Sequence, residues 1–280
     1  MNDARAASYS VNLRQTNGVM RTKAGGGSNL REDFFQAAEL CFAAAMWLVP
    51  RQYRFRAAVL VASAAVPLFR RTEAYREQEM MGFDSPREIA LHFVLNALTR
   101  NGTRFDPVIA VRGYEEFERA YASGQGVLVV GPHAALTLLM IRLFHDRGLD
   151  PVVVSPDPRM RVGGTTVRAR TVQPSPTFLV KTRNRLRRGG LICAMPDRGE
   201  HHGGRTVEFA TAAGRVIIAP ALMQVAARCG AVVVFTEVHA EGRGLVGTLA
   251  SAPGGLPDTI VEGFMDFVRA RAEARSAGHG

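Results

Sequence analysis

The sequence predicts an α/β protein whose mostly parallel central sheet is flanked by helices and preceded by a helical N-terminal part. Two observations carry this prediction. From about residue 107 onward, short apolar runs rich in Val and Ile alternate with helical segments. Buried strands that alternate with helices are typical of a parallel sheet covered on both faces. The chain has 280 residues, 47% of them hydrophobic, which is enough for one large domain.

The first third of the chain predicts a tail followed by helices. Residues 1–29 are polar and rich in Ser, Gly and Arg, and we expect a flexible tail there. A single domain is expected over residues 30–280, with a helical part over 30–104 and the α/β core over 105–280. Ser85-Pro86-Arg87-Glu88 matches a capping box with Pro at the first helical position, so a helix should begin there.

Two apolar segments, Ala37–Val49 and Ala57–Phe69, lie within the helical part. Each is shorter than the roughly 20 apolar residues that a membrane span needs. They predict either helices of the core or an amphipathic hairpin that lies on a membrane surface, and the two alternatives are compatible. The polar edges of such a hairpin would carry Arg51, Arg54, Arg56, Arg70 and Arg71.

The α/β core is expected to contain seven strands and five helices. Val-rich or alternating runs predict the strands, and glycines after several of the helical runs predict where those helices end. The predicted strands are Val108–Val111, Val127–Val130, Val152–Val154, Thr165–Val172, Leu191–Met195, Arg205–Phe209 and Val232–Phe235. The predicted helices are Tyr114–Ser123, Ala134–Phe144, Thr177–Arg188, Ile217–Arg228 and Ile260–Arg271.

Charge and cysteine content restrict the partners and the compartment. The net charge is +10, which favours an anionic lipid, a phosphorylated substrate or an acidic carrier protein. No nucleic acid is expected, because no zinc-finger spacing, basic-aromatic motif or basic heptad region is present. Cys41, Cys193 and Cys229 form neither a disulfide framework nor a metal-ligand pattern. We therefore expect reduced cysteines, no metal and a cytoplasmic protein.

One histidine stands at the position where α/β sheets do chemistry. The strand Val127–Val130 ends in Gly131-Pro132-His133, directly before a predicted helix. His133 is thus the candidate general base, and free N–H groups at the start of the helix could stabilise an oxyanion. The alternative is a partly buried histidine bonded to a carbonyl. Asp197 follows the strand Leu191–Met195, and parallel strands end at one edge, so it could lie near His133.

Four short stretches, in this order, resemble the bacterial lipid A late acyltransferases, the lauroyl and myristoyl transferases of the glycerolipid and lysophospholipid acyltransferase superfamily. The resemblance covers roughly residues 30 to 250 and lies in the order and spacing of these stretches. They are Gly124–His133, Leu186–Gly190 leading to Met195-Pro196-Asp197, Phe209–Gly214, and Ala226–Val234.

The resemblance implies a glycerolipid acyltransferase-like α/β fold and transfer of an acyl group from a thioester on acyl carrier protein or coenzyme A. In the family the acceptor is a hydroxyl of an anionic lipid, commonly at the inner membrane surface, and no metal or organic cofactor is required. His133 matches the catalytic histidine. For Arg168 and Arg170 we expect contacts to phosphate or carrier, or else a solvated basic strand face. Thr137 and Arg198 are further candidates for substrate binding.

Two departures from the family pattern change the expected acceptor. Leu138 stands five residues after His133, where the family has Asp or Glu, and the segment from Pro158 to Leu186 is short. These departures predict a diverged relative of specialised metabolism whose acceptor is a hydroxyl, an amine or a carrier-bound intermediate. The alternative is a non-catalytic descendant that binds acyl chains or carrier proteins. Carboxylates that could replace the missing one are Asp197, Glu200, Glu208 and Glu237. A serine hydrolase or a dehydrogenase is not expected, because G-x-S-x-G and G-x-G-x-x-G are absent.

Overall fold

The computed structural model describes residues 40–72, 75–76, 79, 84–155, 170–173, 175, 177–197, 205–242 and 244–277. The expected tail, Arg168, Arg198, Glu200 and most of the predicted strand Thr165–Val172 lie outside these residues.

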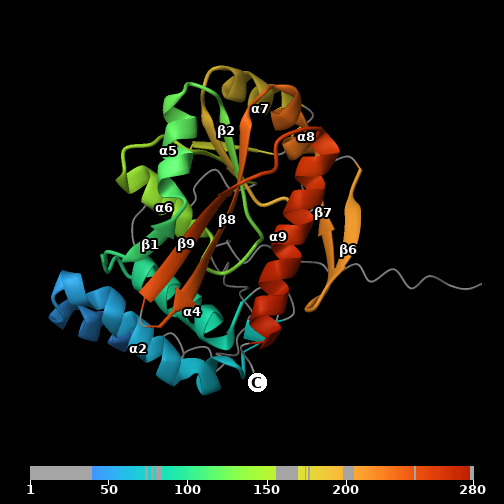
Figure 1. Cartoon of the computed structure of the whole chain (residues 1–280). Coiled ribbons are helices and arrows are strands. Elements are labelled where there is room, and N and C mark those ends of the chain that lie inside the picture. Colours follow the sequence, from blue (N-terminus) through green and yellow to red (C-terminus); the bar gives the residue numbers. More distant parts are fainter. Residues whose placement is uncertain are drawn as a thin grey trace, which may run out of the picture.

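The helical N-terminal part contains a helix at residues 40–48, α2 (Arg51–Phe69) and α4 (Pro86–Arg100). The predicted capping box is present at α4: the Ser85 hydroxyl accepts the Glu88 N–H, and the Glu88 carboxylate accepts the Ser85 N–H. Helix α2 lies along the outer side of α4 (Figure 1) and turns Phe55, Ala58 and Val59 inward. Among the described residues, no helix is long and apolar enough to cross a membrane.

The central sheet has seven strands in the order β1-β9-β8-β2-β5-β3-β4. Neighbouring strands are parallel except for β8 and β9, which form an antiparallel pair. The expected mostly parallel sheet flanked by helices is therefore confirmed. The strands are β1 (Ile109–Arg112), β2 (Val127–Val130), β3 (Val152–Val154), β4 (Arg170–Val172), β5 (Leu191–Ala194), β8 (Val232–Glu241) and β9 (Gly244–Ser251).

Helices cover both faces of the sheet, and the period of two along each strand divides the core between them. Val127 and Val129 of β2 pack in the cluster that contains α2, α4, α5 (Tyr114–Ala122) and α6 (Leu138–Asp146). Leu128 and Val130 pack on the other face, beneath α7, α8 and α9 (Figure 1). These three helices are Phe178–Arg187, Ala221–Arg228 and Pro257–Ala277.

The structure corrects the prediction at two hairpins. Strand β8 continues beyond Phe235 to Glu241 and pairs with β9 in a hairpin. The sequence did not predict β9, because its glycines and small residues have low strand propensity. Strands β6 (Val207–Thr211) and β7 (Gly214–Ile218) form a separate antiparallel pair. Because Ile217 belongs to β7, helix α8 begins at Ala221 and not at Ile217.

Close packing at the start of β2 predicts a strong effect of one added methyl group. A Cβ at Gly126 would overlap the backbone carbonyl of Leu186, and backbone atoms cannot rotate away. We expect Gly126→Ala to lower the free energy of unfolding by about 1–3 kcal/mol or more. The control Gly254→Ala meets no atom within 4 Å and should change it by less than about 0.5 kcal/mol. Urea unfolding measures both, and equal effects would contradict this packing.

Candidate active site at the carboxyl edge of the sheet

The loops that follow β2 and β5 meet at the carboxyl edge of the sheet. Val130 and Ala194 are register partners, and the N–H of Gly131 donates to the Ala194 carbonyl at 3.2 Å. Two residues farther on, the N–H of His133 donates to Oδ2 of Asp197 at 2.5 Å. The parallel strands thus bring together the two residues that the sequence placed at this edge.

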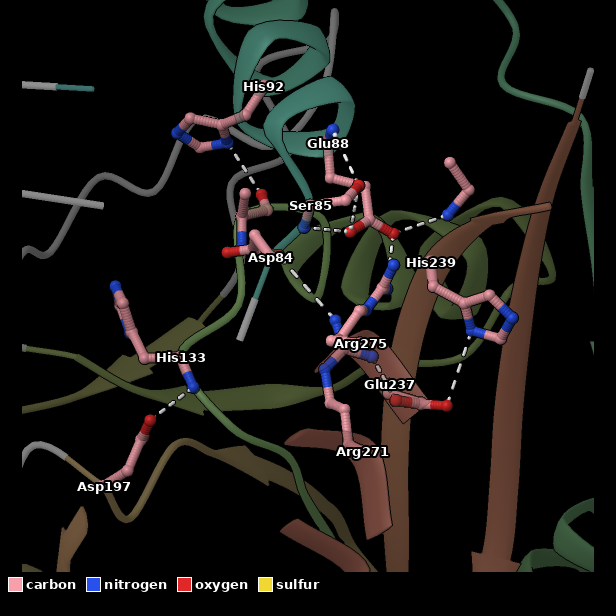
Figure 2. A network of polar contacts seen from close by, with 12 residues as sticks. Asp84, Ser85, Glu88, His92, His133, Asp197, Glu237, His239, Arg271 and Arg275 are labelled. Atoms are coloured by element: carbon pink, nitrogen blue, oxygen red, sulfur yellow. Dashed lines mark hydrogen bonds and ion pairs between the residues drawn. The ribbon is translucent and has the colours of Figure 1, made fainter. Parts of the chain in front are cut away.

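The Asp197 carboxylate contacts the backbone nitrogen of His133. In Figure 2 the carboxylate approaches this nitrogen from one side, and the imidazole of the half-buried His133 extends to the other side. A carboxylate that orients a catalytic histidine bonds to a ring nitrogen. The contact drawn here fixes the loop that carries the ring, so Asp197 acts on the position of the histidine through its main chain.

Two N–H groups at and after His133, where the sequence predicts free donors, are occupied by carboxylates of the chain itself. Helix α6 begins at Leu138, four residues later than predicted, and a turn precedes it. Within this turn the N–H of Ala135 donates to Oδ2 of Asp84 at 2.8 Å. The N–H groups of His133 and Ala135 therefore both face carboxylates of the chain itself. A substrate oxyanion would need donors other than these two N–H groups.

Asp84 belongs to a buried ionic network that sequence reasoning missed. Its side chain is fully buried, and Oδ1 lies 3.7 Å from Nη2 of Arg271 on α9, which is almost as buried. Arg271 in turn pairs with Glu237 of β8 (Figure 2). Glu237 was a candidate partner for the His133 ring, and it is engaged with Arg271 and with His239, 3.4 Å away. No sequence motif links these residues, which come from three separate segments.

Glu88 extends the same network beyond its capping role. One carboxylate oxygen accepts the Ser85 N–H at 2.7 Å, and the other accepts the Ala240 N–H at 2.7 Å. The latter oxygen also accepts from Arg275 of α9 at 2.5 Å. The start of α4 is thereby joined to the β8 extension and to the end of α9, next to the loop of His133 (Figure 2).

His92 of α4 contacts the other side of the same loop. Its Nδ1 lies 2.7 Å from the carbonyl oxygen of Ala135, and its Nε2 lies 2.8 Å from Nδ2 of Asn96. A neutral ring with its proton on Nδ1 satisfies both contacts, because it donates to the carbonyl and accepts from the amide. Loss of hydration lowers the pKa of His92, although the bond to Ala135 opposes this. The ring is therefore neutral at pH 7.

Leu138, five residues after His133, lines a small pocket next to His92. Asn96, Leu95 and Leu136 are among the other lining residues. The side chain at this position therefore contributes an apolar wall beside a neutral histidine. An ionised carboxylate here would stand next to these leucines and would lose part of its hydration.

The remaining predicted residues lie at separate places in the fold. Thr137 is buried, and its hydroxyl has no hydrogen-bond partner among the described residues. Arg170 begins β4, is exposed and lies 3.4 Å from Asp150. Glu208 pairs with Arg215 on the β6–β7 hairpin. Within the described part of the chain, no group of His, Cys, Asp or Glu side chains could hold a metal ion.

Comparison with known proteins adds no assignment: no protein-family model matches the chain, and no curated protein matches it.

The ionic network predicts that the free energy of unfolding decreases at acid pH. Burial alone would raise the pKa of Glu237, but the hydrogen bond from His239 and the contacts with Arg271 outweigh it and lower the pKa to about 2. In the unfolded chain this carboxyl titrates near its ordinary value of 4.5. Its contribution is thus present above pH 4.5 and is lost as the pH falls toward 2.

We expect Glu237→Gln to cost on the order of 3 kcal/mol of unfolding free energy at pH 7, with the cost shrinking steadily below pH 4.5. The control Glu208→Gln breaks an exposed pair and should cost less than about 1 kcal/mol at any pH. Urea unfolding at a series of pH values measures both. A cost for Glu237→Gln that does not vary with pH would contradict the depressed pKa.

Proposed function

We propose that this chain is an acyltransferase that moves an acyl group from a carrier-protein or coenzyme A thioester to a hydroxyl or amine acceptor, with His133 as general base. The carrying observation is the position of His133. It lies in the loop after β2, beside Asp197 from the loop after β5, at the edge where parallel α/β sheets bind their ligands. The order of the sequence motifs around these two residues supports the same reaction.

The reaction needs one proton shuttle. The acceptor oxygen or nitrogen forms a bond to the thioester carbonyl carbon while its proton passes to the His133 ring. The carbon–sulfur bond then breaks, and the departing thiol takes that proton from the imidazolium. The carboxylate of Asp197 accepts the backbone N–H of the same residue and thereby fixes where the ring receives the proton.

Leu138 and the occupied N–H groups favour an acceptor that needs little activation. A neutral amine is already a good nucleophile, whereas a hydroxyl depends more strongly on a polarised base. The proposed acceptor is therefore an amine, or a hydroxyl of a lipid that the site holds close to His133. The donor is an acyl carrier protein or acyl-coenzyme A.

A second candidate is a non-catalytic protein of the same fold that binds acyl chains or carrier proteins. The observation that favours it is the pair of carboxylates on the His133 and Ala135 N–H groups. These carboxylates occupy the donors nearest to the histidine that could stabilise an oxyanion.

One substitution tests the proposed base. We expect His133→Ala to lower acyl transfer by about 10²–10⁴-fold, the usual contribution of a general base. The matched control is His145→Ala, which removes an exposed histidine of α6 and should leave the rate unchanged. The purified protein is incubated with acyl-carrier or acyl-coenzyme A thioesters and a panel of lipid and amine acceptors, and products are followed by mass spectrometry. Transfer that persists in His133→Ala would refute the base.

We further propose that the protein works at the cytoplasmic face of the inner membrane and contacts it through α2 and the preceding helix. Seven of the eleven exposed large hydrophobic residues described lie between residues 40 and 68. We call them the N-terminal apolar surface: Leu40, Trp47, Leu48, Tyr53, Leu60, Val61 and Leu68. On α2 these exposed residues lie on the side that faces away from the core. Leu60 and Leu68 stand roughly opposite the buried Phe55 and Ala62 on the helix.

Charge favours an anionic bilayer as the partner of the N-terminal apolar surface. Residues 40–72 contain five arginines and no acidic residue. Amphipathic helices with Arg at their edges and Trp or Tyr at the interface lie in the headgroup region of anionic membranes. The acceptor of the proposed reaction would then be reached from the membrane surface.

Vesicle binding tests this contact. We expect the double variant Leu60→Ser/Leu68→Ser to bind vesicles of phosphatidylglycerol and phosphatidylethanolamine at least about tenfold more weakly, because each inserted Leu contributes roughly 1.5 kcal/mol or more. The control Leu256→Ser removes an exposed leucine outside this surface and should bind like the parent chain. Co-sedimentation measures both. Equal binding by the parent chain and the double variant would contradict the proposed contact.

A further inference from the structure

We propose that Asp84 and His92 are positioning residues for His133: together they hold the peptide around Ala135 and thereby set where the histidine ring stands. This inference rests on the proposed function of His133, and it assigns to α4 a role in the active site. Neither residue belongs to a motif that the sequence analysis connected with catalysis.

Both backbone groups of Ala135 are held from α4 or its start. Asp84 accepts the Ala135 N–H at 2.8 Å, and the ring of His92 donates to the Ala135 carbonyl at 2.7 Å. Asp84 directly precedes the capping residue of α4, and His92 lies two turns along that helix. Asp84 and His92 thus both contact the residue that lies two positions after His133 (Figure 2).

The side chains of Asp84 and His92 are themselves fixed by other contacts. Asp84 is fully buried, and its second oxygen faces the Arg271 guanidinium of α9. On the other side of the loop, Asn96 contacts Nε2 of His92 at 2.8 Å and so keeps the donating proton on Nδ1. The side chain that accepts the Ala135 N–H, Asp84, is therefore paired with Arg271. The side chain that donates to the Ala135 carbonyl, His92, has a defined tautomer.

Asp197 completes the arrangement from the opposite side. With its bond to the His133 N–H, residues 133–135 are held at three backbone groups by side chains from the start of α4, from α4 itself and from the loop after β5. Loops that carry reactive groups are usually the mobile parts of a fold. Here the loop is pre-organised, which is what a base must be when it acts on a bound acceptor.

The test measures the reactivity of the His133 ring toward diethyl pyrocarbonate, which acylates neutral accessible imidazoles. Rates are read by mass-spectrometric peptide mapping on the full chain, and the exposed His145 serves as the internal reference. We expect Asp84→Ala to raise the rate at His133 at least fivefold, because the half-buried loop is released. Asp84→Asn should stay within twofold of the parent rate, because its amide oxygen still accepts the Ala135 N–H.

A matched control and a second pair of variants keep the outcome decisive. Asp266→Ala removes an exposed carboxylate paired with Arg269 and should leave the rate at His133 unchanged. If Asp84→Ala does not fold, judged by circular dichroism, His92 replaces it as the tested residue. We then expect His92→Leu to raise the rate at His133 at least fivefold and His92→Gln, whose amide can donate to Ala135, to remain within twofold. Equal rates at His133 in His92→Leu and the parent chain, or in His92→Leu and His92→Gln, would overturn the proposal. An equal increase of this rate in Asp84→Asn and Asp84→Ala would also overturn it.

These readouts need no substrate, so they are independent of the proposed reaction. Altered reactivity of His133 in a chain without acyl transfer would uphold the positioning role and reject the proposed function. In an active chain, His92→Leu should lower kcat at least tenfold with KM within threefold, and His92→Gln should recover most of kcat. A change confined to KM would overturn the positioning role.

Discussion

The hydrogen bonds from the backbone of residues 133–135 to Asp197 and Asp84 are the contacts on which the rest of the site depends. A strand-to-helix turn in an α/β fold normally offers its N–H groups to an anionic ligand. In this chain two carboxylates from distant segments take that place. The loop is thereby fixed without a ligand, and its histidine stands at the carboxyl edge of the sheet in a set position.

A fully buried carboxylate such as Asp84 requires compensation, because loss of hydration is costly for a charge. Arg271 supplies the opposite charge, and Glu237 balances Arg271 in turn. The same region is joined a second time through Glu88, Ala240 and Arg275. Consequently the end of α9, the β8 extension and the start of α4 form one polar support behind the reactive loop. Helix α4 thus serves both as cover for the sheet and as part of the site.

The sequence predicted what depends on local pattern and on general rules of parallel sheets. Strands β2 and β3 have their predicted bounds, the capping box opens α4, and Asp197 lies beside His133 because parallel strands end at one edge. Strand β9 was missed because its glycines and small residues carry little strand propensity. Asp84 and His92 could not be found, because they reach Ala135 across 51 and 43 residues and belong to no motif.

Amide hydrogen exchange at His133 and Ala135, measured by NMR in the unmodified full chain, tests this account most directly. If the two carboxylates hold the loop, both N–H groups should exchange on the order of a hundredfold more slowly than unstructured peptides, comparably to the amides in the middle of β2. Exchange of either amide at the rate of an unstructured peptide would mean that the loop is open in solution. A set position for His133 could then not be the basis of its function.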